Sequence, residues 1–354
     1  MTSTSEFSVL SIAGAVKLLT GAYTSLIESG SPMKSFPSVM LWGAPGVGKS
    51  DGVRQIATGI EEKTDKKVKV TDVRLLLFNP VDLRGIPTAD AQRETAIWLK
   101  PAIFRMDASD DVVNILFLDE ISAAPPSVQA AAYQITLDRT VGEHKLPDNC
   151  IVIAAGNRVT DRSVAYNMPK ALANRLCHME ISCDCEGWLE WAALSDIHEC
   201  VTGFISYRPQ FLLVDDGKKN SDDLAYPTPR SWAMVSNILK NAKGDIDAMF
   251  PLIAGCVGNE AAEELRNWNE IYKKLPSARS IFEGEYTGVP TRPEAMYILA
   301  ANMIEYARKN HTKKDIINAT AYANRLKTEF RFILFRAFRK IPAVNAVMEE
   351  LELG

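Results

Sequence analysis

The stretch Gly43-Ala44-Pro45-Gly46-Val47-Gly48-Lys49-Ser50 satisfies the phosphate-binding pattern G-x-x-x-x-G-K-[ST] at every required position. Residues 39–42 before it predict a short buried strand, and a helix is predicted from Lys49 onward. In that setting the backbone N–H groups of the loop and of the helix N-terminus surround an anion. Lys49 is then placed to contact the outer phosphates of a nucleotide, and the Ser50 hydroxyl to bind magnesium. The alternative is an ordinary glycine loop, but the flanking strand and helix favour a nucleotide site.

Length and composition set limits on the class of protein. A chain of 354 residues is long enough for two domains, and 47% hydrophobic with 24% charged residues is typical of a soluble globular protein. The net charge of −4 argues against a surface dedicated to coating nucleic acid. Residues 1–11 lack the basic start and apolar run of a secretory signal, and no stretch is long enough to span a bilayer. We therefore expect a cytoplasmic protein.

Six cysteines are spread along the chain, and Cys183 and Cys185 form the only close pair. A second close pair of cysteines, which would complete a zinc pattern, is missing from the sequence. The cysteines are therefore predicted to be reduced thiols.

Apolar runs alternate with helical patterns over the first half of the chain. Helices are predicted at 11–28 and 127–137, and strands at 68–73, 112–118, 151–155 and 176–182. The run 112–118 is almost continuously apolar, which is typical of a central parallel strand covered on both faces. Strands that alternate with helices predict an α/β fold with an open parallel sheet.

The pattern changes near residue 186, because helical periodicity dominates from there to the end. Helices are predicted at 231–240, 261–274, 292–308 and 315–340, and the last of them, from about residue 325, is expected to bury an aromatic face. The predicted division is an α/β nucleotide-binding core at 1–185 and an all-helical lid domain at 186–354. The core carries an irregular insertion at about 74–106 and a hairpin at about 138–147.

Polar residues follow two of the predicted strands. Asp119 and Glu120 end the apolar run, at the sheet edge where ligands bind in open α/β proteins. Asp119 is expected to hold magnesium, and Glu120 to polarise an attacking water. Asn157 follows the next strand, where its amide could orient a water or touch a terminal phosphate; the alternative is a turn residue.

In order and spacing, these motifs resemble the AAA+ ATPases, and within them the MoxR group. The likeness covers most of residues 37–182: Walker A at 43–50, Walker B with its following Glu at 116–120, Asn157, and the stretches 118–129 and 146–148. The resemblance implies a P-loop NTPase (AAA+) core followed by a helical lid. It also implies ATP and Mg²⁺ as cofactors, with ATP hydrolysed at the subunit interfaces of a ring, expected to be a hexamer.

Two arginines gain predicted roles from this resemblance. Residues 168–175 resemble the segment in which MoxR proteins carry the arginine finger, here Arg175, although a surface ion pair is the alternative and Arg162 competes for the role. Arg230 follows Thr228-Pro229, a helix start, where a cation opposes the helix dipole unless an anion is bound nearby. The pattern resembles the sensor 2 arginine of the lid; the alternative is an arginine tolerated near solvent.

The function implied by the resemblance is that of a MoxR-type ATPase that remodels or activates a partner protein, such as one carrying a von Willebrand factor A domain. The insertion and the hairpin look like those that MoxR proteins turn toward the pore or the substrate, with surface decoration as the alternative.

A restriction-type AAA+ motor acting on nucleic acid is the main rival, and the acidic net charge speaks against it. A nucleotide-gated binding module with little turnover is a second rival, disfavoured by Asp119, Glu120 and Asn157. Neither a nucleic acid nor a membrane is expected as a partner.

Overall fold

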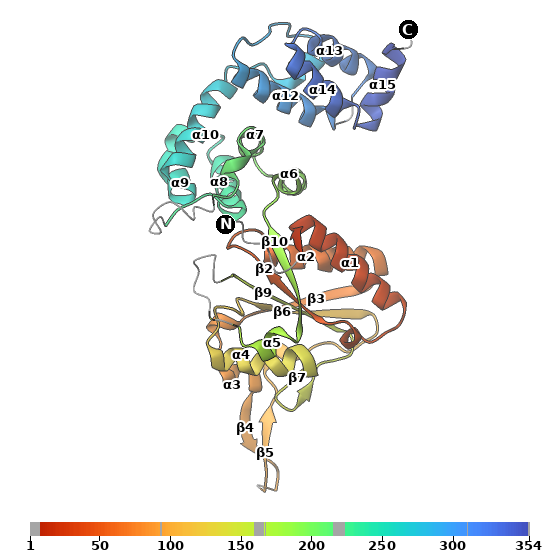
Figure 1. The fold of residues 1–354 in the computed structure, drawn as a ribbon, viewed down its shortest axis with the longest axis vertical. Helices are drawn as coiled ribbons and strands as arrows, with labels where there is room; N and C mark the ends of the chain where they lie inside the picture. Colours follow the sequence, from red (N-terminus) through yellow and green to blue (C-terminus); the bar gives the residue numbers. More distant parts are fainter. Residues whose placement is uncertain are drawn as a thin grey trace. The chain divides into compact units, whose positions relative to one another are not determined.

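The computed structural model of the chain describes residues 8–92, 94–158, 166, 168–214, 224–309 and 311–352, with the side chains of Tyr133 and Glu294 left aside. The chain divides into two compact units, Met1–Gly187 and Trp188–Gly354. Each unit is described by itself below (Figure 1).

A parallel six-stranded sheet forms the centre of the first unit. Its strands are, in spatial order, β1 (Val9–Ser11), β10 (Leu176–Ser182), β2 (Ser38–Trp42), β9 (Cys150–Gly156), β6 (Val112–Asp119) and β3 (Lys67–Arg74). Every neighbouring pair runs parallel. The predicted α/β fold with an open parallel sheet is therefore confirmed. The sequence did not predict β1, whose three residues are too few to show a periodic pattern.

Helices cover both faces of this sheet, as a parallel sheet requires. One face carries α1 (Ile12–Glu28) and α2 (Lys49–Thr64), and the other carries α3 (Pro80–Arg84), α4 (Pro126–Tyr133) and α5 (Lys170–Ala173) (Figure 1). Three 3-10 turns join these elements, η1 (Met33–Ser35), η2 (Leu75–Leu77) and η3 (Ala102–Phe104), and α4 continues into a π-helical turn, η4 (Gln134–Asp138). Ser11 is the N-cap of α1, and its hydroxyl accepts a hydrogen bond from Gly14 N at 3.1 Å.

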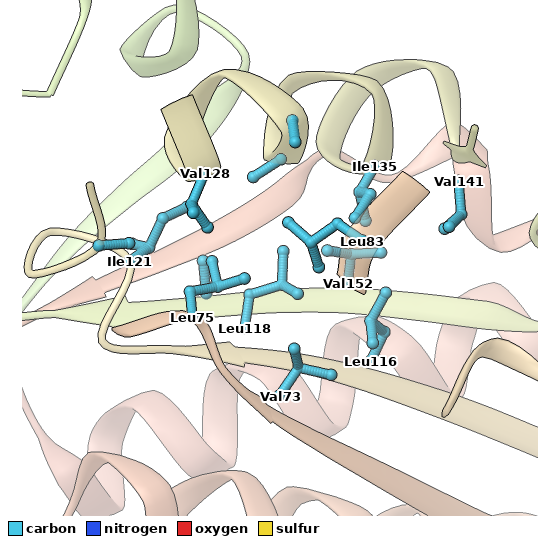
Figure 2. Packing of buried hydrophobic residues seen from close by; sticks show 14 of the residues in the cluster. Val73, Leu75, Leu83, Leu116, Leu118, Ile121, Val128, Ile135, Val141 and Val152 are labelled. Atoms are coloured by element: carbon cyan, nitrogen blue, oxygen red, sulfur yellow. The ribbon is translucent and has the colours of Figure 1, made fainter. Parts of the chain in front are cut away.

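The main core of the first unit lies between the sheet and α4. Leu116 and Leu118 of β6 pack beside Val152 of β9, and Val128 of α4 covers them (Figure 2). All residues of β6 from 112 to 118 are buried, which confirms the central position that its apolar run predicted. Each fully buried aliphatic side chain contributes about 1.5–3 kcal/mol.

Two hairpins extend from the first unit. They are formed by β4 (Ile86–Ala89) with β5 (Ala96–Leu99), and by β7 (Thr140–Val141) with β8 (His144–Lys145). The turn of the second hairpin touches the base of the first, where His144 Nε2 lies 2.8 Å from Trp98 O. A Cβ on Gly142, in the same turn, would come within 2.6 Å of Arg84 O at the end of α3. The first hairpin leaves an apolar face in solvent, with Ile86 63% and Leu99 55% exposed.

The regular secondary structure among the described residues of the second unit is all helical. Its helices are α6 (Cys185–Leu194), α7 (Glu199–Tyr207), α8 (Pro229–Asn241), α9 (Ile246–Val257), α10 (Asn259–Tyr272), α11 (Ala278–Phe282), α12 (Pro293–Ala307), α13 (Lys313–Ala323), α14 (Thr328–Phe338) and α15 (Pro342–Glu352), with a 3-10 turn, η6 (Pro209–Phe211), after α7. The predicted helical character of this region is confirmed.

One predicted helix of this unit is wrong in its extent. The pattern over 315–340 is divided between α13 and α14, because the backbone leaves the helical conformation at Lys327, where φ is −57° and ψ is 150°. Leu326, in the intervening turn, is buried in the core of the unit. The helix expected to end the chain is followed by α15. Its aromatic face behaves only partly as predicted, since Phe330 and Phe338 are buried whereas Phe332 is 72% exposed.

All six cysteines are free thiols. Within the described part of the chain, no group of three or more His, Cys, Asp or Glu side chains could hold a metal ion. Burial raises the pKa of Cys150, Cys183 and Cys200 to about 12. The described residues also include no helix with the length and apolar character needed to cross a bilayer.

These raised pKa values predict slow alkylation of the folded protein. At pH 8, a thiol of pKa about 12 has about a thousandfold less thiolate than an unperturbed cysteine. Iodoacetamide should therefore label Cys150, Cys183 and Cys200 slowly at pH 8, and much faster when the same protein is unfolded in urea. Mass spectrometry of timed samples measures both rates. Equal rates in the folded and unfolded protein would contradict the prediction.

Candidate functional site

The loop 43–48 leaves the carboxyl end of β2, between β9 and β10, and leads into α2. Gly46 and Gly48 have φ values of 79° and 100°, in the left-handed region that favours glycine. A Cβ on Gly43 would lie 2.7 Å from Ile181 O on β10, so this position must also lack a side chain. Gly48 is the N-cap of α2 and offers no side-chain cap, which leaves the first N–H groups of the helix available to an anion.

Lys49 is buried against this loop, with 8% of the residue exposed. Its Nζ donates to Gly43 O at 2.6 Å, to Ala44 O at 3.0 Å and to Asn157 Oδ1 at 3.0 Å. The structure thus brings Lys49 and Asn157 together, although 108 residues separate them in sequence. A cation held at this point lies where the charge of a bound phosphate would be.

Ser50 and Asp119 form the second contact of the site. The Ser50 hydroxyl donates to Asp119 Oδ2 at 3.0 Å, and Glu120 N donates to Asp119 Oδ1 at 2.8 Å. A hydroxyl and a carboxylate side by side are the oxygen ligands that Mg²⁺ prefers, so these residues fit that ion. Glu120 has a φ of 57°, a backbone conformation that is uncommon for a residue with a side chain.

Ser122 is a residue of this site that sequence reasoning did not identify. Its hydroxyl accepts a hydrogen bond from Asn157 N at 3.0 Å, and its carbonyl accepts one from Tyr166 N at 2.7 Å. A Cβ on Gly156 would come within 2.7 Å of the Ser122 hydroxyl, so the contact requires glycine there. Ser122 therefore positions Asn157 from the loop that follows Glu120, and no motif marks such a contact in the sequence.

Arg175 lies at the opposite end of the sheet from the loop. It directly precedes β10, whose first residue Leu176 pairs with Ser38 at the start of β2. The loop begins five residues after Ser38, which corresponds to about 16 Å along the strand. Arg175 is half-buried, and its backbone N–H donates to Leu172 O at 2.9 Å. The structure does not bring Arg175 together with the phosphate loop of its own chain, and Arg162 lies outside the described residues.

Arg230 belongs to the second unit. Thr228 Oγ1 accepts from Ser231 N at 3.0 Å, so the predicted helix start is confirmed, with Pro229 and Arg230 in the first turn of α8. Arg230 is exposed. Its contact with a phosphate stays a prediction.

Comparison with known proteins agrees with this geometry. Residues 38–178 match the family described as "ATPase family associated with various cellular activities (AAA)", so this segment of the chain is an AAA-family ATPase domain. The match includes the phosphate loop, Asp119, Glu120 and Asn157. None of the curated proteins matches the chain.

Several solved structures show a loose likeness. A RuvB mutant from Thermotoga maritima is 16% identical over 83% of this chain and 84% of its own, with a TM-score of 0.41. ORC2 from Aeropyrum pernix is 10% identical over 93% and 88%, with a TM-score of 0.41, and NtrX from Brucella abortus is 14% identical over 90% and 67%, with a TM-score of 0.37. Similarities at this level do not indicate a shared function.

The contact between Gly156 and Ser122 predicts a stability effect. Gly156→Ala should lower the free energy of unfolding by about 1–3 kcal/mol, because the new methyl group displaces Ser122 or the buried Met40. Gly21→Ala is the matched control: a Cβ at this helical position meets nothing within 4 Å, and the change should stabilise the protein by about 0.5–1 kcal/mol. Urea denaturation measures both. Equal stability of the two variants would show that the Ser122 contact relaxes without cost.

Proposed function

We propose that this protein is a magnesium-dependent ATPase of the MoxR type, which assembles into a ring and uses ATP hydrolysis to remodel or activate a partner protein. The observation that carries the proposal is the cluster at the carboxyl ends of three adjacent strands. There, Lys49 contacts Asn157 and Ser50 contacts Asp119, each at 3.0 Å. These are the residue types that phosphoryl transfer needs, because catalysis of that reaction consists mainly of positioning and charge stabilisation.

Each residue of the cluster is assigned one task. The backbone of residues 43–50 and the Lys49 ammonium would hold the phosphates of ATP. Ser50 and Asp119 would hold Mg²⁺, which neutralises phosphate charge when bound. Glu120 would accept a hydrogen bond from the attacking water and polarise it, and Asn157 would orient that water or contact the terminal phosphate without adding charge.

The role of Glu120 is tested by Glu120→Gln, which keeps the shape of the side chain and removes its charge. Nucleotide affinity should stay near that of the wild type, whereas the steady-state rate of ATP hydrolysis should fall by at least about a hundredfold. Glu62→Gln, on the exposed face of α2, is the matched control and should leave both quantities unchanged. Binding of a fluorescent ATP analogue and phosphate release measure them. Turnover near the wild-type rate would remove Glu120 from the mechanism.

The proposal of a ring, with six subunits as the expected number, is supported by the position of Arg175. Since about 16 Å of strand separate Arg175 from the loop of its own chain, its guanidinium can serve a nucleotide only on another subunit. An arginine supplied in this way stabilises the charge that develops on the transferred phosphoryl group. Arg162 remains the competing candidate for this role, and Arg230 is proposed to reach the terminal phosphate from the helical unit.

Mixed assemblies test whether Arg175 acts between subunits. Arg175→Ala should bind ATP normally but hydrolyse it on the order of 10³–10⁵ times more slowly, and Lys49→Ala should fail to bind ATP. A mixed assembly places an intact Arg175, from a Lys49→Ala subunit, beside an Arg175→Ala pocket. ATPase activity should therefore recover when the two variants are mixed after disassembly. Confirmed mixed assembly without recovery would count against Arg175 and in favour of Arg162.

The partner is proposed to be a protein, and one with a von Willebrand factor A domain is the first expectation. The likeness of residues 118–129 and 168–175 to MoxR proteins supports this choice, and the free thiols support a cytoplasmic setting. A chain carrying Glu120→Gln would hold ATP without turnover, so it is the form in which the partner should be retained most tightly.

A further inference from the structure

A chain of hydrogen bonds joins the phosphate loop to the segment that carries Arg175. Trp42, the last residue of β2, donates from Nε1 to His178 Nδ1 at 2.8 Å, and their rings are nearly parallel at 18°. His178 Nε2 lies 2.8 Å from Ala173 O. Ala173 ends α5, two residues before Arg175.

The chemistry of these groups determines the direction of each bond. An indole N–H can only donate, so His178 Nδ1 is the acceptor and the imidazole hydrogen is on Nε2. That hydrogen is donated to Ala173 O. One imidazole therefore satisfies both partners at once, which neither an aliphatic side chain nor a phenyl ring could do.

The two segments that these hydrogen bonds join, the phosphate loop and α5, both need support from outside themselves. The loop residue Gly43 directly follows Trp42, and its carbonyl accepts from the Lys49 ammonium at 2.6 Å. At the other end, α5 has only four residues, which is too short for a helix to be stable by itself. The hydrogen bonds from Trp42 through His178 to Ala173 thus span the length of β2, from its carboxyl end to the amino end of β10.

We propose that His178 is a positioning residue, which holds the Arg175 segment in a defined place relative to the phosphate loop of the same subunit. Through its bond to Trp42, His178 fixes the position of Arg175, which acts on the nucleotide of the neighbouring subunit. The inference rests on the proposed function, since it assumes that Arg175 acts on the nucleotide of an adjacent subunit.

The test compares His178→Phe, Trp42→Phe and the control His311→Phe in the full-length chain. His311 lies in the helical unit, where its Nε2 is 2.6 Å from Tyr306 O, so its replacement loses a bond of the same kind. His178→Phe should lower kcat by about tenfold to a hundredfold, because a small misplacement of a charge-stabilising group is costly. Its KM for ATP should stay within about twofold of the wild type. Trp42→Phe, which removes only the Nε1–H donor, should act in the same direction, and His311→Phe should match the wild type.

Mixing with Lys49→Ala subunits then shows where the defect lies. An intact Arg175 from Lys49→Ala should restore activity to His178→Phe pockets, as it should for Arg175→Ala pockets. If Arg175→Ala recovers and His178→Phe does not, or if the KM of His178→Phe rises with kcat unchanged, His178 supports its own loop and the inference is overturned. If Arg175→Ala itself fails to recover, the proposed function is wrong at this point. Should thermal melting show that His178→Phe is unfolded, Trp42→Phe in the same mixtures decides in its place.

Discussion

A hydrogen bond of 3.0 Å from the Lys49 ammonium to the Asn157 amide oxygen ties the phosphate loop to the end of the neighbouring strand. It depends on a parallel register in which Trp42 pairs with Gly156, so that both strands end at the same level. Ser122 then orients Asn157 from the loop that follows β6, and it can approach only because residue 156 is glycine. The site therefore forms because strands that lie far apart in the sequence are neighbours in the sheet.

Local pattern was sufficient to predict five of the six strands of this sheet, all except the three-residue β1. The residues of the phosphate loop are recognisable one by one, because each backbone conformation there demands glycine or a defined side chain. The apolar run 112–118 predicted a central strand, since only burial on both faces tolerates it. Asp119 and Asn157 could be placed at one edge before any contact was known, because parallel strands bring their carboxyl ends together.

Contacts that depend on tertiary structure could not be predicted from the sequence. Ser122 and His178 act through bonds to Asn157 and Trp42, and nothing in their local pattern distinguishes them from ordinary polar residues. The division between α13 and α14 lies at Leu326 and Lys327, in a stretch whose helical periodicity continues across both residues. The separation of Arg175 from its own loop likewise became visible only with the register of β10 against β2.

The strand order also determines when the phosphate loop can fold during synthesis on the ribosome. The neighbours of β2 in the sheet are β9 and β10, which end at residues 156 and 182. When residues 38–50 have been synthesised, the strand that carries the loop has no partner, and more than a hundred further residues must emerge before it is paired. Pairings of such long sequence separation are slow, because the closure entropy is lost before the contacts form. The phosphate loop is thus synthesised early but takes up its folded structure late. A nascent chain can form the nucleotide site only when nearly the whole first unit has been made.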